Sequence, residues 1–278
     1  MSQLDADLTR HYAFTDVEAA VSTALNTLDT EGAELALKDL AALDQFHVGG
    51  MDASRSLAQK AGLKAGDRVL DVGGGLGGSA RLLAREFGCE VTVLDLMSSY
   101  CRVGEMLTER TNLVDRVHFQ QGNALDMPFA DQSFDVIWTQ HSSMNIADKQ
   151  GLYAQIYRVL RAGGILVMHE VTAGEVQPVQ FPVMWARDAS MSFLMSPAAL
   201  QELLIRAGFE VQSWQDTSDE SLTWLDERFA AQKQAGGSAN KLGLQLLLGS
   251  DLGLLSRGYT QNLRERRVRV IQTVLRHP

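Results

Sequence analysis

The stretch Val69-Leu70-Asp71-Val72-Gly73-Gly74-Gly75-Leu76-Gly77-Gly78 decides the fold. A short apolar run ends at an acid, glycines follow at every second position, and residues 79–87 continue at helical spacing. Glycine accepts a positive φ and lets the backbone pass close to a ligand. The pattern therefore predicts a strand, a tight turn and a helix, with a nucleotide-like cofactor held at the carboxyl end of a parallel strand.

The composition is that of an ordinary globular protein and excludes several classes. The 278 residues are 45% hydrophobic, and the formal net charge of −9 argues against a nucleic-acid partner, which would need a basic face. The acidic start is neither a signal peptide nor a transit peptide, and the most apolar stretch, 244–248, is too short to span a bilayer. Cys89 and Cys101 lack the spacing of metal ligands and are expected as buried thiols. We expect a cytoplasmic protein that holds no metal and has no membrane span.

From Asp67 onward, strand patterns alternate with helical patterns. Strands are expected at 68–72, 90–94, 117–120, 134–138, 165–170 and 209–214, and helices at 79–87, 99–111 and 149–160 and after the Ser196-Pro197 start signal. The tail at 267–275 begins with alternating charged and apolar residues, as an antiparallel strand near a sheet edge does. Because strands alternating with helices form parallel crossovers, we expect an α/β fold with a mostly parallel seven-stranded sheet and an antiparallel last strand.

Two further segments are expected to cover the carboxyl edge of this sheet. Helical apolar spacing at 17–28 and 33–42 indicates that residues 1–50 form a helical N-terminal lid, followed by one domain at 51–278. An insert at about 173–200 is rich in large apolar side chains, as a cap over a substrate pocket would be. His11 and His118 are expected at the surface.

Four motifs together resemble those of the class I S-adenosylmethionine-dependent methyltransferases. They are the 69–78 stretch, Asp95 closing the second strand, Gly122-Asn123-Ala124-Leu125-Asp126-Met127-Pro128-Phe129, and Phe134-Asp135-Val136-Ile137-Trp138 followed by 158–166. The resemblance runs from Gln45 to the end of the chain. It implies a Rossmann-like fold, S-adenosylmethionine as cofactor, S-adenosylhomocysteine as product and a small-molecule methyl acceptor. Gly73, Gly75 and Gly78 also satisfy the G-x-G-x-x-G pattern of nicotinamide-dependent dehydrogenases, but such an enzyme would have no reason to carry the last two motifs.

The resemblance assigns the cofactor to residues around the glycine turn. Asp71 would anchor the cofactor's ammonium group, directly or through water, or would only cap the turn. Asp95 would accept hydrogen bonds from both ribose hydroxyls, and Asn123 would read the edge of adenine. The residues expected to bind the cofactor are Asp71, Gly73, Gly75, Gly77, Asp95, Leu96, Asn123, Ala124 and Gln140.

The acceptor pocket is expected over the carboxyl ends of the fourth and fifth strands. His141 is the candidate general base, or else a hydrogen-bonding partner of the cofactor or the sheet edge. Side chains alternate along a strand, so only one of His169 and Glu170 faces the pocket. We expect Glu170 there, stabilising a cationic amine, with a structural ion pair as the alternative. Further acceptor contacts are expected from Asn145, Trp185 and Arg187, the last as a carboxylate clamp or a surface arginine.

Within the superfamily the chain resembles the sarcosine/dimethylglycine N-methyltransferase group, through 44–50, 76–81 and 137–140. That resemblance implies that His47 folds over the cofactor and is a third catalytic candidate. Departures from the group's pattern occur at Asp95, Tyr100, His141 and Asn145. We expect methyl transfer to a small amine first, and to an oxygen or carbon of a natural product or lipid intermediate second. A nicotinamide-dependent dehydrogenase and a non-catalytic methyltransferase-like partner protein are weaker alternatives, and the sequence is compatible with a homodimer.

Overall fold

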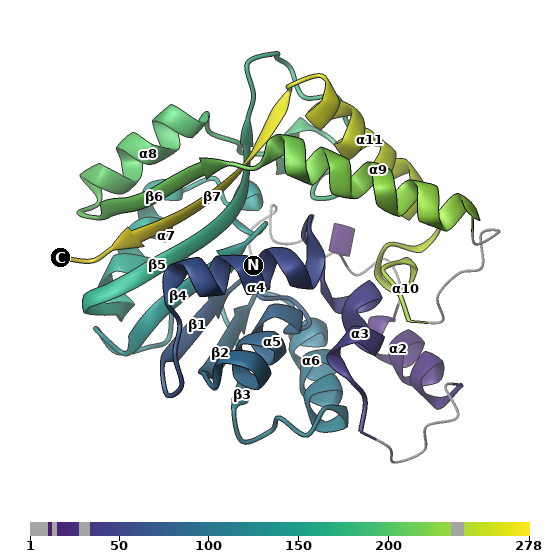
Figure 1. The fold of residues 1–278 in the computed structure, drawn as a ribbon, viewed down its shortest axis with the longest axis horizontal. Coiled ribbons are helices and arrows are strands. Elements are labelled where there is room, and N and C mark those ends of the chain that lie inside the picture. The colour runs from purple at the N-terminus through teal and green to yellow at the C-terminus, as the bar shows by residue number, and fades with distance from the viewer. Residues whose placement is uncertain (1–10, 13–15, 28–33, 235–241) are drawn as a thin grey trace.

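The protein is built around one seven-stranded sheet (Figure 1). The computed structural model describes residues 11–12, 16–27, 34–234 and 242–278. The strands are β1 (Arg68–Val72), β2 (Glu90–Asp95), β3 (Val117–Gln121), β4 (Phe134–Gln140), β5 (Leu160–Ala173), β6 (Glu210–Asp216) and β7 (Val268–Arg276). Their order is β3-β2-β1-β4-β5-β7-β6, and β7 runs antiparallel to its neighbours β5 and β6. The expected sheet with an antiparallel last strand is therefore confirmed.

Helices flank the sheet and cover its edge. They are α2 (Val17–Asn26), α3 (Leu37–Asp44), α4 (Gly50–Ala61), α5 (Gly78–Phe87), α6 (Ser98–Arg110), α7 (Lys149–Val159), α8 (Pro197–Arg206), α9 (Ser218–Gln234), α10 (Gln245–Leu248) and α11 (Leu252–Arg264). The sequence predicted α5, α6 and α7 to within one residue at each end. It did not predict α4, α9 or α11, and the second N-terminal helix begins at Leu37 rather than near residue 33.

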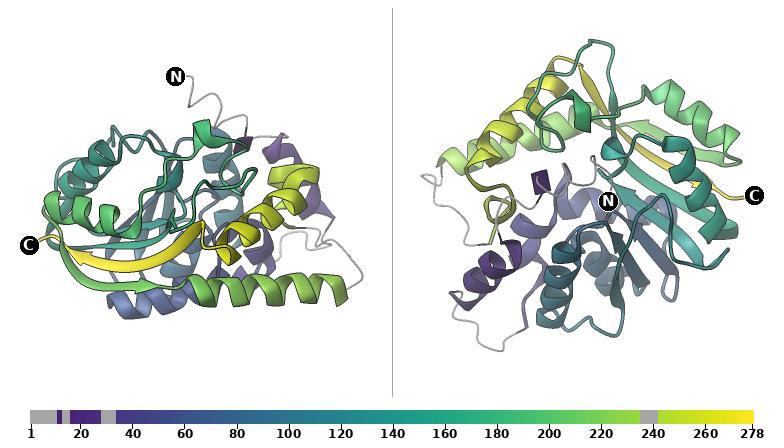
Figure 2. Two further views of the ribbon diagram at one scale, coloured as in Figure 1. Left: turned by 90° about the horizontal axis from the view of Figure 1, so that it is seen from above. Right: turned by 180° about the vertical axis from the view of Figure 1, so that it is seen from behind.

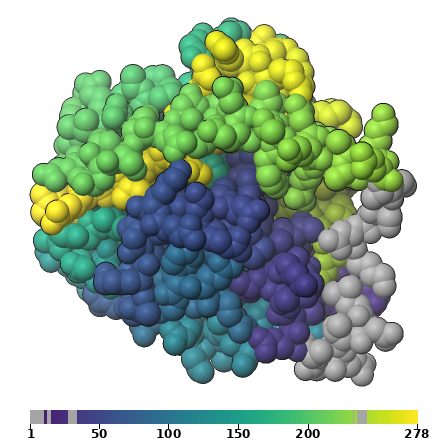
Figure 3. Space-filling model, in the orientation of Figure 1, coloured from purple at the N-terminus to yellow at the C-terminus, as the bar shows by residue number. Residues whose placement is uncertain are grey.

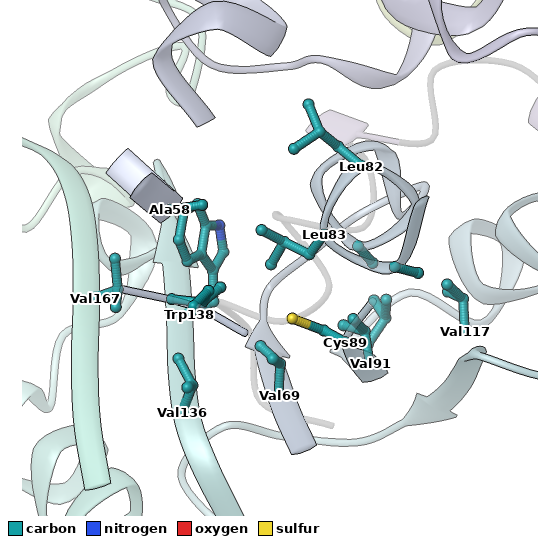
Figure 4. Packing of buried hydrophobic residues seen from close by; sticks show 14 of the residues in the cluster. Ala58, Val69, Leu82, Leu83, Cys89, Val91, Val117, Val136, Trp138 and Val167 are labelled. Atoms are coloured by element: carbon teal, nitrogen blue, oxygen red, sulfur yellow. The ribbon is translucent and has the colours of Figure 1, made fainter. Parts of the chain in front are cut away.

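Both faces of the sheet are buried, because successive strand residues point to opposite sides. Val69 and Trp138 pack on the face that α4 and α5 cover. Their neighbours Leu70 and Ile137 pack on the other face, among side chains of α7 and α8. Figure 4 shows the first of these layers, with Trp138 beside Ala58 of α4. Since apolar side chains fill both faces, chemistry is confined to the ends of the strands.

The turn after β1 needs glycines because other segments of the same chain approach its backbone closely. A Cβ at Gly73 would lie 2.5 Å from the Cβ of Ser142, and the φ of Gly73 is +70°. A Cβ at Gly78, the first residue of α5, would lie 2.3 Å from the carbonyl oxygen of Asp44. The turn therefore packs against two segments, the end of α3 and the loop after β4.

Helices α2, α3, α9, α10 and α11 lie around one end of the sheet (Figure 1). α2 packs against α6, and α3 packs against α5. In both views of Figure 2, α9 and α11 lie together and extend from the β6–β7 pair toward these N-terminal helices. On the face drawn in Figure 3, α9 forms a band along the surface above α4. No helix in the described part of the chain is both long and apolar enough to cross a bilayer.

Expectations about four single residues can be compared with the structure, and one of them is wrong. Cys89 and Cys101 are buried free thiols, as expected, and burial raises the pKa of each to about 12. The expectation of a surface position for His11 is wrong. Its imidazole is buried against Tyr12, and Nε2 lies 3.0 Å from the carbonyl oxygen of Met184 in the cap insert. His118 is exposed, as expected.

Candidate active site

A large cavity opens where the first four strands end. Its volume is about 1000 Å³, at the upper end of the range of small-molecule sites, and this accommodates a cofactor and an acceptor together. The strand ends and loops of β1, β2, β3 and β4 line it with residues 71–76, 94–97, 122–125, 140–142 and 144–148. Residues 42–48 and side chains of α9, α10 and α11 form further walls. The lid role expected for residues 1–50 stays a prediction.

Asp71 ends β1's apolar run with a buried carboxyl group that lines the cavity. No described residue donates a hydrogen bond to its Oδ2. Burial raises the pKa of Asp71 to about 7, and the nearby carboxyl group of Asp95 contributes to the rise. Because a buried carboxylate without a partner is costly, this position fits a cationic group such as the ammonium of an amino acid.

Asp95 lies at the end of the neighbouring strand β2. Its Oδ2 accepts a hydrogen bond from the amide of Gly75, and its Oδ1 accepts one from the amide of Met97, each at 2.9 Å. Burial raises the pKa of this carboxyl group as well. Each carboxylate oxygen keeps a second lone pair, so Asp95 can still accept two hydroxyl groups of a ribose.

The other residues expected to bind the cofactor fall into two groups. Gly73, Gly75, Leu96, Asn123, Ala124 and Gln140 line the cavity. The Oδ1 of Asn123 accepts a hydrogen bond from the amide of Leu125 at 2.9 Å, which fixes its side chain beside the cavity. Gly77 does not line the cavity, so that expectation is corrected. It caps the start of α5 with a φ of +77°, and a Cβ there would lie 2.6 Å from the ring of Phe119.

Gln140 is held by a buried polar network at the end of β4. Its Oε1 accepts hydrogen bonds from the hydroxyls of Ser79 at 2.6 Å and Ser54 at 3.1 Å, and from Trp138 Nε1 at 2.8 Å. Its Nε2 lies 3.3 Å from His169 Nδ1. Three donors on one oxygen fix the orientation of the amide, and its NH₂ group therefore faces His169.

Three histidines meet beside this network. The rings of His47, His141 and His169 have centroids 4.8 to 6.1 Å apart. Burial lowers the pKa of His47 to about 4 and that of His141 to about 3, and it lowers the pKa of His169 well below its ordinary value. Mutual repulsion adds to this effect for His141 and His169. All three imidazoles are therefore neutral at pH 7.

His141 is oriented by its own backbone and by β5. Its φ is +50°, and both its amide and its Nδ1 lie within hydrogen-bond distance of the carbonyl oxygen of His169, at 2.8 and 3.0 Å. A carbonyl oxygen only accepts, so Nδ1 carries the proton of the neutral ring and Nε2 carries the lone pair. That Nε2 lies 3.5 Å from the hydroxyl of Tyr259, which also lines the cavity. His141 thus presents a proton acceptor at the cavity.

Glu170 does not face the cavity, and this corrects the expectation. Its carboxylate accepts hydrogen bonds from Thr139 Oγ1 at 2.7 Å and from Ser143 Oγ at 2.9 Å, and it is only 1% exposed. Burial raises the pKa of Glu170. His169 occupies the opposite side of β5, near His47 and His141, as the alternation along a strand requires.

The cap insert contributes to the cavity, but not through all the residues expected. Trp185 is buried and lines the cavity. Asn145 lines the cavity too, and its side-chain amide group is hydrogen-bonded to other parts of the protein. It accepts from Tyr12 Oη at 2.7 Å and donates to the carbonyl oxygens of Trp185 and Met191, each at 2.8 Å. Arg187 lies outside the cavity, where it pairs with Asp251 at 2.8 Å. The structure therefore does not support a substrate clamp at Arg187.

Several cavity residues were missed because they lie on helices that were not predicted. They are Trp224, Leu225, Arg228 and Phe229 on α9 and Leu252, Ser256 and Tyr259 on α11. A signal was present in the sequence, since the apolar residues of both helices recur every three or four positions. Those residues are Leu222, Leu225 and Phe229 in α9, and Leu252, Leu255, Tyr259 and Leu263 in α11.

Comparison with known proteins finds a known domain in the part of the chain that holds the first four strands. Residues 70–168 match the family model of a methyltransferase domain. Residues 70–168 thus resemble a methyltransferase domain, and the fold around them is that of the class I S-adenosylmethionine-dependent methyltransferases. The fold class that the motifs predicted is confirmed, and the match favours the methyltransferase over the dehydrogenase alternative.

The curated proteins that this chain resembles differ in the atom that their names give as the methyl acceptor. A sterol 24-C-methyltransferase of Eremothecium gossypii is 30% identical over 59% of this chain and 45% of its own length. A glycine/sarcosine/dimethylglycine N-methyltransferase of Actinopolyspora halophila is 29% identical over 59% of this chain and 29% of its own. The O-methyltransferase cnsE of Penicillium expansum is 36% identical over 52% of this chain and 53% of its own. The chain spans about half or less of the length of these relatives.

Solved structures have the same fold along the whole chain. The phosphoethanolamine N-methyltransferase 2 of Haemonchus contortus, at 20% identity, covers 100% of this chain with a TM-score of 0.75, over 61% of its own length. The geranyl diphosphate C-methyltransferase of Streptomyces coelicolor A3(2), at 16% identity, covers 100% with a TM-score of 0.70, over 99% of its own length. Carbon, nitrogen and oxygen methylation all occur among these proteins, so the acceptor atom has to be argued from the cavity.

Proposed function

We propose that this protein transfers a methyl group from S-adenosylmethionine to a hydroxyl oxygen of a largely apolar small molecule. The observation that carries the proposal is the pairing, in one cavity, of an unpartnered buried carboxyl group at Asp71 with an unprotonated Nε2 at His141. Asp71 fits the cationic part of the cofactor, and His141 fits an acceptor that must lose a proton.

The cofactor end supplies binding and orientation. S-adenosylmethionine, when bound, supplies a methyl group already activated on a sulfonium. Asp71 would hold the cofactor's ammonium, Asp95 its ribose and Asn123 its adenine, with the backbone of Gly73 and Gly75 close to the ligand. The catalytic task of the chain is then mainly positioning, because a nucleophile held in line and about 3–3.5 Å from the reacting carbon gains most of the rate.

The acceptor end favours an apolar molecule over a small zwitterion. Cavity residues from η1 (Ser143–Asn145), the cap insert and α9 to α11 are mainly aromatic or aliphatic: Met144, Met184, Trp185, Trp224, Leu225, Phe229, Leu247, Leu252 and Tyr259. Glu170, which would have stabilised a cationic amine, is turned into the protein and hydrogen-bonded there. These observations favour the second of the sequence-based expectations, an oxygen or carbon acceptor, over the first.

His141 favours oxygen over carbon. Its Nε2 lone pair lies beside the hydroxyl of Tyr259, where the hydroxyl proton of an acceptor could be taken up as the new bond to oxygen forms. The low pKa of His141 means that the imidazole is already unprotonated at neutral pH. A low pKa also makes it a weak base, and its contribution is therefore greatest if the proton leaves late, when the oxygen has become acidic.

Transfer to an amine is the second candidate. It is supported by the position of His47, which the resemblance to the sarcosine/dimethylglycine group implied. The segment 42–48 lines the cavity, and the ring of His47 lies 6.1 Å from that of His141. An amine acceptor would need no base, so His141 would then only shape the pocket.

The test is release of S-adenosylhomocysteine from S-adenosylmethionine with three matched sets of acceptors. The sets are apolar alcohols and phenols, the same molecules with an amino group in place of the hydroxyl, and the glycine, sarcosine and dimethylglycine series. Turnover of the hydroxyl set that exceeds turnover of the amino set supports the proposal. Turnover confined to either amine set contradicts it. Binding of S-adenosylhomocysteine without any turnover favours the non-catalytic alternative.

A further inference from the structure

We propose that Arg228 on α9 binds an anionic group, a carboxylate or a phosphate, carried by the methyl acceptor. The inference rests on the proposed methyl transfer and specifies its substrate class. Arg228 lines the cavity together with its helix neighbours Trp224, Leu225 and Phe229. Among the described residues that line the cavity, it is the one lysine or arginine.

Arg228 has no partner of opposite charge in the described part of the chain. Its guanidinium carbon lies over the ring of Trp224, 5.2 Å from the ring centroid, and the structure gives it no ion pair. Other arginines nearby are paired, Arg187 with Asp251 and Arg264 with Asp226. Desolvation lowers the pKa of Arg228.

The acidic residues of the cavity lie on other segments than Arg228 does. Asp71 and Asp95 follow β1 and β2, at the end assigned to the cofactor. Asp44 is committed to a buried ion pair with Arg81, and Asp148 caps α7 by accepting from the amide of Gly151 at 2.8 Å. The cavity therefore has a carboxylate-bearing side that suits a cation and a single cationic position on α9 that suits an anion.

The surroundings of Arg228 set the rest of the acceptor. A guanidinium presents parallel N–H donors that match the oxygens of a carboxylate or phosphate, and a cation–π contact with Trp224 leaves these donors free for a ligand. The side chain is exposed to solvent, so a ligand can reach it. Since the neighbouring lining is aromatic and aliphatic, the acceptor that fits has an apolar body with one oxyanion attached.

The experiment uses the full chain saturated with S-adenosylhomocysteine and four probes with one alkyl chain. Decanoate and decyl phosphate carry the anion, decanol is neutral, and decylamine is cationic. Calorimetry measures the dissociation constant of each probe for the wild type, for Arg228→Met, which keeps the apolar stem, and for Arg257→Met. The last is the matched control, because Arg257 is on α11 and does not line the cavity.

The wild type is expected to bind decanoate or decyl phosphate about 10- to 100-fold more tightly than decanol, the range of a charge-assisted hydrogen bond. Arg228→Met should remove that preference and leave decanol binding within about threefold, while Arg257→Met should retain it. The better of the two anions identifies carboxylate or phosphate. Three results would overturn the proposal. The wild type could bind the anions and decanol equally, it could prefer decylamine, or Arg228→Met could keep the preference for the anions. Because binding of S-adenosylhomocysteine is measured first, a failure of the cofactor assignment is seen separately.

Discussion

Arg81 of α5 and Asp44 of α3 form a buried ion pair, with Nη2 2.8 Å from Oδ2 and side chains that are 0% and 3% exposed. Arg81 Nη1 also donates to the carbonyl oxygen of Gly104 and to the hydroxyl of Thr108. The pair joins the helix that follows the glycine turn to the 42–48 wall of the cavity, of which Asp44 is a part. The ion pair thereby fixes two walls of the proposed cofactor site to each other, although the two walls are distant in the sequence.

Removing one member of this pair should destabilise the fold. Arg81→Met leaves the carboxylate of Asp44 buried without a partner, and such changes cost about 3–5 kcal/mol. We expect a loss of this size in denaturant unfolding, together with weaker binding of S-adenosylhomocysteine. Arg55→Met is the control, since Arg55 pairs with Glu86 at the surface and such pairs contribute about 1 kcal/mol or less. Similar losses for the two variants would show that the buried pair does not hold these walls.

Asp71→Asn should weaken cofactor binding and stabilise the empty protein. The pKa of Asp71 is raised to about 7, so the folded state holds this proton more tightly than the unfolded state. Stability of the empty protein therefore falls as pH rises from about 4 to about 7, and above that range a charged carboxylate is buried without a partner. We expect Asp71→Asn to raise the melting temperature at pH 8, measured by calorimetry without ligand.

The same carboxyl group should make ligand binding depend on pH. A cationic ligand needs the ionised carboxylate, so the affinity of the wild type for S-adenosylhomocysteine should fall by up to about tenfold for each pH unit below 7. Asp71→Asn should bind it weakly at every pH. The control Asp131→Asn changes an exposed acid that pairs with Arg158 at the surface. A wild-type affinity that does not change between pH 5.5 and 8 would contradict the role given to Asp71.

His141→Asn should slow transfer to a hydroxyl acceptor about 10²-fold at saturating cofactor, the lower end of the range for a general base, because the low pKa of His141 makes it a weak base. Asparagine tolerates the positive φ of this position, so the backbone should be retained and cofactor affinity unchanged. His118→Asn, at an exposed position on β3, should have no effect. An equally slow His141→Asn reaction with an amine acceptor would indicate a structural role instead.

The pH profile of the wild type gives an independent check on His141. A pKa near 3 keeps the imidazole neutral throughout the neutral range. The turnover number at saturating cofactor should therefore show no inflection near pH 6.5, where an ordinary histidine titrates. An inflection there that disappears in His141→Asn would show that the ring is far less desolvated during the reaction than its buried position implies.

Trp224→Ala should raise the KM for the acceptor about tenfold and leave the KM for the cofactor unchanged. Trp224 lines the cavity from α9, and loss of an aromatic contact with an apolar ligand removes buried area and stacking together. Glu227→Ala, an exposed change on the same helix, is the control for helix stability. Equal effects on both KM values would mean that α9 supports the whole cavity rather than the acceptor end.

The strand, turn and helix at the proposed cofactor site could be predicted from the sequence, because their signals are local. An apolar run, the glycines after it and the helical spacing that follows lie within twenty residues of each other, from Val69 to Phe87. The acceptor half depends on contacts between distant segments. Tyr259 meets His141 from 118 positions away, and no pattern in either segment indicates the other.

The choice between His169 and Glu170 failed for a different physical reason. Alternation along β5 shows that the two side chains point to opposite sides of the sheet, one of them to the side that α4 covers. Apolar helices cover both sides, so the alternation of residues does not indicate which side carries the site. Arg187 was a weaker choice than Arg228 because a sequence cannot show which arginine already has a carboxylate partner.

The most direct test of this account is a calorimetric titration of the wild-type protein with S-adenosylhomocysteine at pH 8, beside a titration with NAD. We predict binding of one S-adenosylhomocysteine per chain with a micromolar dissociation constant, loss of at least about tenfold in affinity in Asp71→Asn, and no binding of NAD. A folded wild-type protein that binds NAD and not S-adenosylhomocysteine would contradict the cofactor assignment, and with it the proposed methyl transfer.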